Sequence, residues 1–354
     1  MNVALLGLSH PHSALLLATL ELRPEVGGIY LWDEDPAVVA AFPKASEGKR
    51  LGASTELSQL LARPDLKLVV VCMRHDRSAA VATKAVAAGK HLVAEKPVGL
   101  TRAEIDAVDQ AARRTGVVAS VLYPRRFHPA MLAAQSLARS GELGPLLTAE
   151  VRFLTTQVKY RDPKSWLFHR ATSGGGMLLW LGCHCLDLLH FVSGDEIVEV
   201  GARLATRSGE AIDVEDVCAL SLGFRSGAVG TFNAGYTLAY SGSGYVNAAG
   251  YDSYLGFNHQ RGRIVWPDLN PRLVVERPPA AGQSPLSEVP FAMPASAAYG
   301  GVAGDEFFNR FFQALRGEGA PPTTLEDARR TAEIVAAAAE SSRDGKFVRV
   351  GRPA

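Results

Sequence analysis

The sequence predicts an α/β protein with two domains. In the first half of the chain, short apolar strands alternate with helical stretches, a pattern typical of a doubly wound parallel sheet. In the second half, long strand-like segments follow one another without a helix between each pair, which favours an open, mainly antiparallel sheet in a second α/β domain. A charged loop after one buried strand, at residues 91–101, marks a ligand-binding edge, because open α/β sheets bind ligands at the carboxyl ends of their strands.

The composition narrows the classes of partner. With 354 residues and a formal net charge of +1, the balanced charge gives no support for a nucleic-acid or membrane-surface partner. We find no apolar run of the roughly 18 residues needed to span a membrane, and Met1–Gly7 enters a strand without the basic flank of a signal peptide. The cysteines lie in apolar surroundings and are expected to be reduced core thiols of a cytoplasmic protein: Cys72, Cys183, Cys185 and Cys218.

The domain boundary is placed where the alternation of strands and helices ends. Residues 1–122 form the dinucleotide-binding domain, and residues 123–354 form a domain for substrate binding and oligomerisation. The last helix, at about residues 323–342, could pack back on the N-terminal domain. In the second domain, the expected strands include 147–155, 198–205, 217–224 and 228–236, with hairpins over 247–277, an extended crossing over 278–294 and an edge strand at 347–350.

The first strand, Asn2–Leu6, leads through a polar loop into a helix that begins at Ser13. This strand–turn–helix context is the one in which a G-x-G-x-x-G loop binds pyrophosphate. Gly7 is kept, whereas Ser9 and His12 occupy the second and third glycine positions. The cofactor is expected to contact Gly7, Leu8, Ser9, His10 and His12, with hydroxyl or imidazole groups donating to phosphate. Alternatively, the loop only caps the helix; a metal held by His10 and His12 is less favoured.

Acidic residues follow the second strand, Val26–Trp32. Asp33 lies 26 positions after Gly7 (33 − 7), near the spacing at which a carboxylate accepts hydrogen bonds from the adenosine ribose. A negative charge there repels a 2′-phosphate, so NAD is favoured over NADP. Alternatively, Asp33 or Asp35 is only the N-cap of the next helix, which Pro36 begins.

Two further strand ends carry charged residues. Arg74 and His75 follow the strand 66–73, where they could contact the cofactor or an anionic substrate, or form a solvated helix entry. The strand His91–Ala94 ends in Glu95-Lys96-Pro97, after which Thr101 opens a helix. The alternative for this triplet is an ordinary polar loop between a strand and a helix.

In the second domain, a glycine triplet, Gly174–Gly176, precedes an apolar helix of roughly 15 residues that runs to Phe191. Trp180, His184 and Asp187 are spaced to share one face of that helix. A histidine in an apolar helix is more often a core residue than a catalyst, but the glycines indicate a close backbone approach at a cleft. No second Cys or His pair accompanies the cysteines beside His184, so no metal is expected.

These motifs together resemble the Gfo/Idh/MocA family, the relatives of glucose–fructose oxidoreductase and inositol dehydrogenase. The matching pieces, in the family's order, are Gly89-Lys90-His91 with Glu95-Lys96-Pro97, Arg126-Phe127-His128-Pro129, Gly174–Gly176 with Gly182-x-His184-x-x-Asp187, and Val214-Glu215-Asp216. The resemblance implies an N-terminal Rossmann domain, a C-terminal α/β domain whose open sheet forms a homodimer or homotetramer, and a nicotinamide cofactor.

The resemblance also implies site residues. Lys96 and His184 correspond to the family's active-site lysine and histidine, and both suit alcohol oxidation, in which a base takes the hydroxyl proton. Glu95 is expected to hold Lys96 or the nicotinamide ribose, and Arg74 to contribute to the cofactor site. The substrate is expected to contact six side chains: Lys96, Tyr123, Arg126, Trp166, Trp180 and His184. Where the family commonly has aspartate, this chain has Trp180.

The function implied is that of an NAD-dependent sugar dehydrogenase or similar oxidoreductase, acting on a sugar, polyol or related cyclic alcohol. Two alternatives stay open. One is a non-catalytic regulator of the same fold that binds dinucleotide and ligand, a reading favoured by Trp180 and the substituted glycine loop. The other is a relative that retains and recycles NAD while hydrolysing glycosides.

Overall fold

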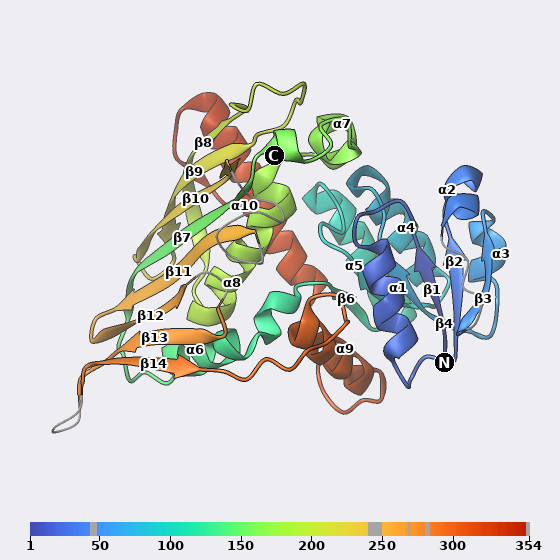
Figure 1. Cartoon of the computed structure of the whole chain (residues 1–354), viewed down its shortest axis with the longest axis horizontal. Helices are drawn as coiled ribbons and strands as arrows, with labels where there is room; N and C mark the ends of the chain where they lie inside the picture. Colours follow the sequence, from blue (N-terminus) through green and yellow to red (C-terminus); the bar gives the residue numbers. More distant parts are fainter. Residues whose placement is uncertain (43–47, 240–249, 268–269, 280–283, 352–354) are drawn as a thin grey trace. The chain divides into compact units, whose positions relative to one another are not determined.

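The computed structural model describes residues 1–42, 48–239, 250–267, 270–279 and 284–351. The chain forms two compact units, one made of Met1–Pro124 with Pro294–Arg329 and the other of Arg125–Met293 with Arg330–Ala354 (Figure 1). The first unit thus includes a segment, 294–329, that the sequence analysis placed in the second domain. Each unit is described by itself below.

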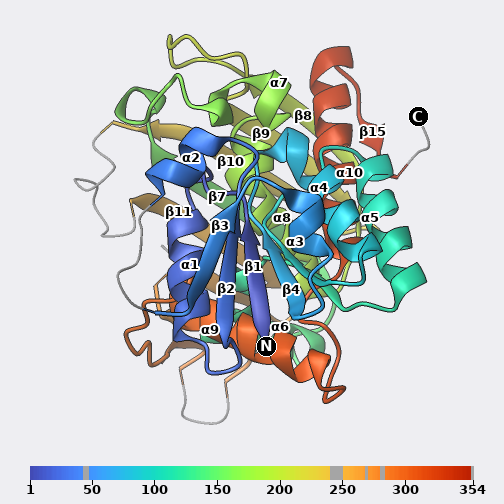
Figure 2. The same ribbon diagram turned by 90° about the vertical axis from the view of Figure 1, so that its right-hand side faces the viewer.

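The sheet of the first unit is parallel and has the order β3-β2-β1-β4-β5-β6. Its strands are β1 (Asn2–Leu6), β2 (Gly28–Trp32), β3 (Arg50–Ser54), β4 (Leu66–Val71), β5 (His91–Ala94) and β6 (Ala119–Val121). The order reverses between β1 and β4, which lie side by side in Figure 2. This reversal is the topological switch point at which doubly wound sheets bind their ligands. The predicted doubly wound sheet is confirmed.

Helices connect these strands, and their ends follow local rules. They are α1 (Ser13–Leu22), α2 (Pro36–Ala41), α3 (Leu57–Leu61), α4 (His75–Ala87) and α5 (Arg102–Thr115), joined by α9 (Gly301–Leu315) from the later segment. Helix α5 begins with a capping box, in which Thr101 accepts from the Glu104 amide and Glu104 accepts in return from the Thr101 amide. It ends at Gly116, whose φ of 68° is in the left-handed region.

The edge strand β6 is closed by a residue from the later segment. The amide of Val121 donates to Thr323 Oγ1 at 3.0 Å, and that hydroxyl donates in turn to the Val121 carbonyl. Ser120 Oγ also donates to the Thr323 carbonyl at 2.7 Å, in a buried position. Thr323 therefore satisfies backbone groups that an edge strand would otherwise leave unpaired.

The sheet of the second unit is large and mainly antiparallel, as predicted. Its order is β14-β13-β12-β11-β7-β10-β9-β8-β15, in which β7 and β10 pair in parallel. The bounds are β7 (Leu146–Thr156), β8 (Ile197–Ala205), β9 (Val217–Phe224), β10 (Val229–Leu238), β11 (Tyr251–His259), β12 (Gly262–Pro267), β13 (Arg272–Glu276), β14 (Leu286–Pro290) and β15 (Val348–Arg349). Strand β14 corrects the expectation of an extended crossing over 278–294, because Leu286–Pro290 pairs with β13 instead.

Helices cover one face of this sheet (Figure 1). They are α6 (Pro129–Arg139), α7 (Arg170–Ser173), α8 (Cys183–Ser193) and α10 (Leu325–Asp344), with 3-10 turns at Pro124–Phe127, Val158–Tyr160 and Trp166–Phe168. Along β9, alternate residues are buried in the same core cluster as the side chains of α8. The period-2 pattern of burial explains why these strands could be located closely from the sequence.

The apolar helix of the second unit differs from its prediction in two respects. A π-helical turn, Leu178–Gly182, precedes α8, so the α-helical spacing that put Trp180 and His184 on one face does not hold across it. By length and composition, the stretch Arg170–Ser193 is also long and apolar enough to cross a membrane, contrary to our expectation that no run reaches that length. However, 89% of its apolar window is buried inside the protein, as in a core helix.

His128, at the N-terminus of α6, links stability to pH. Its Nδ1 accepts a hydrogen bond from the Ala130 amide at 3.1 Å, and its ring lies 4.8 Å from that of Trp266. Burial, followed by the charge of Arg125, lowers the pKa of His128 to about 4. The neutral ring is therefore favoured in the folded state.

We expect this contribution to be complete above the unfolded pKa of about 6.5 and to be lost as the pH falls toward about 4. The variant His128→Asn keeps an acceptor for the helix amide but does not titrate. Urea unfolding should be measured above pH 6.5 and near pH 4. Between these values the free energy of unfolding should fall by up to about 3 kcal/mol more in the wild type than in the variant. An equal loss in the two proteins would contradict the assignment.

Candidate functional site

The carboxyl ends of three neighbouring strands carry the candidate site of the first unit. The loop after β1 supplies His10 and His12, the end of β4 leads into His75, and β5 is followed directly by Glu95 and Lys96. These strands are adjacent at the topological switch point. The sheet thus brings together polar residues that are separated by more than 80 positions in the sequence.

Gly7 is fixed by close packing on both sides. Its φ is 99°, and a Cβ placed on it would lie 2.2 Å from the Cys72 carbonyl oxygen. Its amide donates to the Trp32 carbonyl at 2.8 Å, and its own carbonyl accepts from Ser13 Oγ at 2.9 Å. Only glycine fits here, because any side chain would collide with the backbone beyond β4. The loop turns as a dinucleotide-binding loop does, although its other two glycines are replaced.

The acidic residues after β2 have separate roles. Asp33 is 3% exposed; its Oδ2 accepts from the Leu8 amide at 2.8 Å and its Oδ1 from the Asp35 amide at 3.1 Å. Asp35 is the N-cap of α2, where its side chain accepts from the Ala37 amide at 2.8 Å. The capping role that the sequence left open therefore belongs to Asp35. Asp33 instead ties the β1 loop to the end of β2.

Arg74 and His75 lie at the entry to α4. The Arg74 guanidinium forms a two-pronged ion pair with Asp76, at 3.0 and 2.7 Å, and its side chain is 40% exposed. His75 is buried, and its ring lies 6.4 Å from that of His10. Arg74 thus resembles a solvated helix entry, whereas His75 faces the loop after β1.

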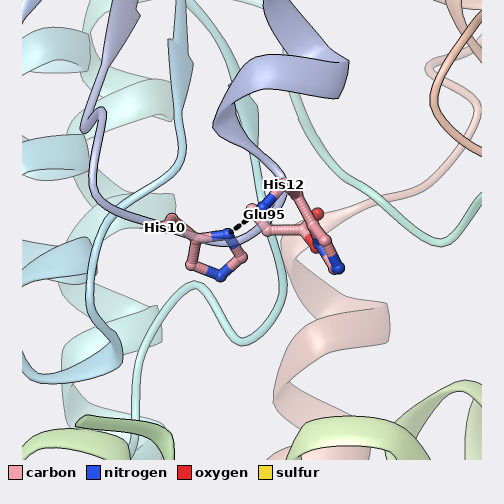
Figure 3. A group of neighbouring side chains, drawn as sticks. All are labelled: His10, His12 and Glu95. Carbon is pink, nitrogen blue, oxygen red and sulfur yellow. Dashed lines mark hydrogen bonds and ion pairs between the residues drawn. The ribbon is translucent and has the colours of Figure 1, made fainter. Parts of the chain in front are cut away.

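A hydrogen-bonded group joins the first loop to the end of β5 (Figure 3). His12 Nδ1 lies 2.6 Å from Glu95 Oε1, and Tyr299 donates its hydroxyl to the same oxygen at 3.2 Å. Glu95 is 2% exposed, and its Oε2 has no hydrogen-bond partner among the described residues. The tyrosine comes from the segment before α9, and no sequence motif indicated it. In this structure, Glu95 contacts the imidazole rather than standing open for a ribose.

His10 and Lys96 lie deeper in the same site. Lys96 is 1% exposed, and its peptide bond to Pro97 is cis. His10 accepts the His12 amide on its Nδ1 at 3.1 Å. Burial, followed by the neighbouring charges of His12, His75 and Lys96, holds the pKa of His10 well below its usual range. His10 is therefore neutral near pH 7, with its proton on Nε2 because Nδ1 accepts a hydrogen bond.

Three of these residues could also hold a metal ion. One ligand atom each from His10, His12 and Glu95 lies within 4.8 Å of the others (Figure 3). The sequence analysis gave low weight to a metal in this loop and did not anticipate Glu95 as a third ligand. A metal would have to displace the hydrogen bond between His12 Nδ1 and Glu95 and contract the group, since bonds of about 2.1 Å place ligand atoms closer together.

In the second unit, His184 and Asp187 both lie on α8 and are buried. Asp187 accepts two hydrogen bonds from Arg126, at 2.8 and 2.5 Å. The guanidinium of Arg126, which we expected to contact substrate, is thus engaged by Asp187 and lies 5.3 Å from the ring of Phe191. Breaking such a buried pair would leave one charge uncompensated.

The remaining candidate substrate residues lie apart from one another along the chain. Trp180 is 5% exposed, within the π-helical turn. Tyr123 is buried after β6 in the first unit, and Trp166 is partly exposed at the start of a 3-10 turn in the second. Their burial does not by itself indicate a substrate, so their assignment remains a prediction.

The glycine triplet has a structural reason that the sequence analysis missed. A Cβ on Gly176 would lie 1.9 Å from the Glu215 carbonyl oxygen, while the Met177 and Leu178 amides donate to the carbonyl and carboxylate of Glu215 at 2.9 and 3.2 Å. Glu215 is buried, which raises its pKa. The close approach inferred from the glycines is therefore to the protein's own Val214-Glu215-Asp216 segment.

This packing predicts the effect of a single methyl group. Gly176→Ala should destabilise the protein by roughly 1–3 kcal/mol or more, because the backbone of Glu215 must move. Gly319→Ala is the matched control, since nothing lies within 4 Å of its added Cβ. Thermal unfolding of both variants checks this. If Gly176→Ala and Gly319→Ala unfold at the same temperature, the inferred close contact of residue 176 with the Glu215 backbone is wrong.

Comparison with known proteins identifies the fold and its relatives. Residues 1–123 match the oxidoreductase family with an NAD-binding Rossmann fold, and residues 131–251 match the GFO/IDH/MocA C-terminal domain. Both matches concern one family and follow the order of the chain. The chain belongs to the Gfo/Idh/MocA family of oxidoreductases.

Named relatives include enzymes of sugar derivatives as well as trans-1,2-dihydrobenzene-1,2-diol dehydrogenases. Levoglucosan dehydrogenase of Pseudarthrobacter phenanthrenivorans is 26% identical over 245 residues, which cover 61% of this chain and 62% of that protein. 1,5-Anhydro-D-fructose reductase of Ensifer adhaerens is 26% identical over 275 residues, covering 77% of this chain and 76% of the relative. The aligned regions thus span 62% and 76% of these two relatives.

Solved structures show the same fold over the whole chain. Levoglucosan dehydrogenase in complex with NADH and L-sorbose superposes with a TM-score of 0.85 at 22% identity, covering 99% of this chain and 98% of that one. Its complex with NADH and levoglucosan gives the same TM-score. The N-terminal parallel sheet and the C-terminal mixed sheet of this chain therefore correspond to those of levoglucosan dehydrogenase.

Proposed function

We propose that this protein is an NAD-dependent oxidoreductase that transfers hydride between a nicotinamide cofactor and a sugar, polyol or related cyclic alcohol. The observation that carries the proposal is the position of Lys96, a buried amine two residues beyond the end of β5, at the binding edge of a dinucleotide-type sheet. Family membership and relatives that are sugar dehydrogenases and reductases support it.

The residues at this edge suit NAD. Gly7 keeps the tight turn beside β4, and the Asp33 carboxylate lies at the end of β2 within hydrogen-bond distance of the loop that it ties down. Among the described residues, each carboxylate oxygen of Asp33 accepts one hydrogen bond, which leaves a lone pair for a ribose hydroxyl. The same negative charge opposes the 2′-phosphate of NADP.

Lys96 would act as the base. When bound, NAD accepts the hydride from the carbon that bears the hydroxyl, and a positive ring beside Lys96 would favour the neutral amine. That amine takes the hydroxyl proton, or returns it in the reverse reaction. His184, on α8 of the second unit, is the second candidate for acid–base work.

Two further properties belong to the same proposal. We place the protein in the cytoplasm, a location with which four buried, free cysteines agree. We also propose a homodimer or homotetramer through the second unit's sheet, because helices cover one face and the alternate residues of β9 on the other face are exposed.

Calorimetric titration with NAD and NADP tests the cofactor. We expect NAD to bind more tightly than NADP, and Asp33→Ala to weaken NAD by about 10- to 100-fold, the loss of one or two hydrogen bonds to a charged group. Asp33→Ala should also reduce the ratio by which NAD binds more tightly than NADP. The matched control is Asp35→Ala, which removes only the α2 cap. A wild-type preference for NADP would refute the role of Asp33, and binding of neither nucleotide would favour a ligand-sensing regulator.

Turnover tests the chemistry. In a screen of sugars and polyols for NADH release, Lys96→Ala should abolish turnover and leave NAD affinity roughly intact. Lys84→Ala, an exposed lysine on α4, is the control and should behave as the wild type. Unchanged turnover in Lys96→Ala would rule out its role as base. Bound NAD that persists through purification without net NADH release would instead favour the NAD-recycling alternative.

A further inference from the structure

The burial of Lys96 raises a question about proton transfer. In alcohol oxidation, the hydride leaves with its electron pair for the nicotinamide, and the hydroxyl proton passes to the amine. The resulting ammonium must lose that proton to solvent before the next turnover. Lys96 is 1% exposed, so the proton needs a path through neighbouring groups.

The neighbours of Lys96 in the first unit include groups that can carry a proton. Glu95 is adjacent in the chain, and its Oε2 is buried without a hydrogen-bond partner among the described residues. His10 is buried, and its burial, together with the nearby charges of His12, His75 and Lys96, lowers its pKa. Its ring lies 4.9 Å from that of His12. His12 is less buried than Glu95 and His10, because its side chain is 19% exposed.

His12 is also held in a defined orientation. Its Nδ1 lies 2.6 Å from Glu95 Oε1, which is a short distance for a charge-assisted hydrogen bond. A carboxylate in this position fixes the proton of the imidazole on Nδ1 and leaves Nε2 to exchange protons with its surroundings. Figure 3 shows the imidazoles of both histidines beside the carboxylate.

We propose that His12, oriented by Glu95, is the proton-relay residue that transfers the proton of Lys96 between this buried cluster and solvent. This inference rests on the proposed function. The balance is simple: the alcohol becomes a ketone, NAD becomes NADH, and one proton leaves through the imidazole without any further oxidant or reductant. His12, which stands where the G-x-G-x-x-G pattern has its third glycine, would then transfer protons in this protein.

The first test examines the orientation without any cofactor. Nitrogen-15 NMR of the histidine rings distinguishes the two tautomers. We expect His12 to carry its proton on Nδ1 and His10 to carry its proton on Nε2, since His10 Nδ1 accepts the His12 amide. Glu95→Gln should change the spectrum of His12 and leave that of His10. A neutral His12 protonated on Nε2 in the wild type would overturn the proposal.

The second test measures proton release directly. A positive nicotinamide ring beside Lys96 should expel a proton on NAD binding, which a pH-indicator dye detects in a stopped-flow instrument with little buffer. His12→Asn keeps an amide nitrogen that can donate to Glu95 but cannot relay a proton. We expect it to release the proton on the order of 100-fold more slowly, and added imidazole to restore the rate.

Tyr299→Phe is the matched control, because it removes the other hydrogen bond to the same oxygen of Glu95 and leaves His12 in place. It should release the proton at the wild-type rate. Equal rates in the wild type and His12→Asn, with NAD binding verified by tryptophan fluorescence, would overturn the relay and leave the cofactor assignment standing.

Other outcomes separate the two proposals. If the wild type shows no fluorescence change with NAD, the cofactor assignment fails, and the NMR test alone decides the orientation of His12. If the wild type retains a stoichiometric metal that EDTA removes, and proton release changes with it, then His10, His12 and Glu95 are a metal site and the relay is overturned.

Discussion

The packing of residue 7 against β4 is the constraint on which the first unit depends. The amide of Cys72 donates to the Leu6 carbonyl at 2.7 Å, and the Cys72 carbonyl occupies the space that a side chain on Gly7 would need. These contacts hold the end of β1 against the end of β4, so the loop after β1 must turn away over the sheet edge. His10 and His12 are placed by that turn, and Glu95 meets them because β5 is the next strand.

Much of this architecture could be predicted because periodicity reports burial. Parallel strands such as β1 are short apolar runs, while burial alternates along strands such as β9, so both kinds were located within a few residues. Lys96 and Asp33 could be named because each lies just beyond the end of such a strand. The capping box of Thr101 and Glu104 was also predicted correctly, because its hydrogen bonds are local in sequence.

The remaining features depend on contacts between distant segments. Tyr299 reaches Glu95 from 204 positions away, and no local pattern indicates that pairing. The glycine triplet suggested a ligand because a sequence shows that space is needed but not what fills it; Glu215 fills it. The π-helical turn at Leu178–Gly182 was likewise not indicated by any local pattern, so α-helical spacing misled the grouping of Trp180 with His184.

The hydroxyl of Thr323 also has a consequence for how the protein folds while the ribosome is synthesising it. It closes the edge of β6, yet it is synthesised about two hundred residues after that strand (separation 202). The parallel sheet can assemble early, but its last edge stays unpaired until residue 323 has been made. The N-terminal 124 residues alone would keep that open edge, so the first unit is completed late in synthesis although it begins the chain.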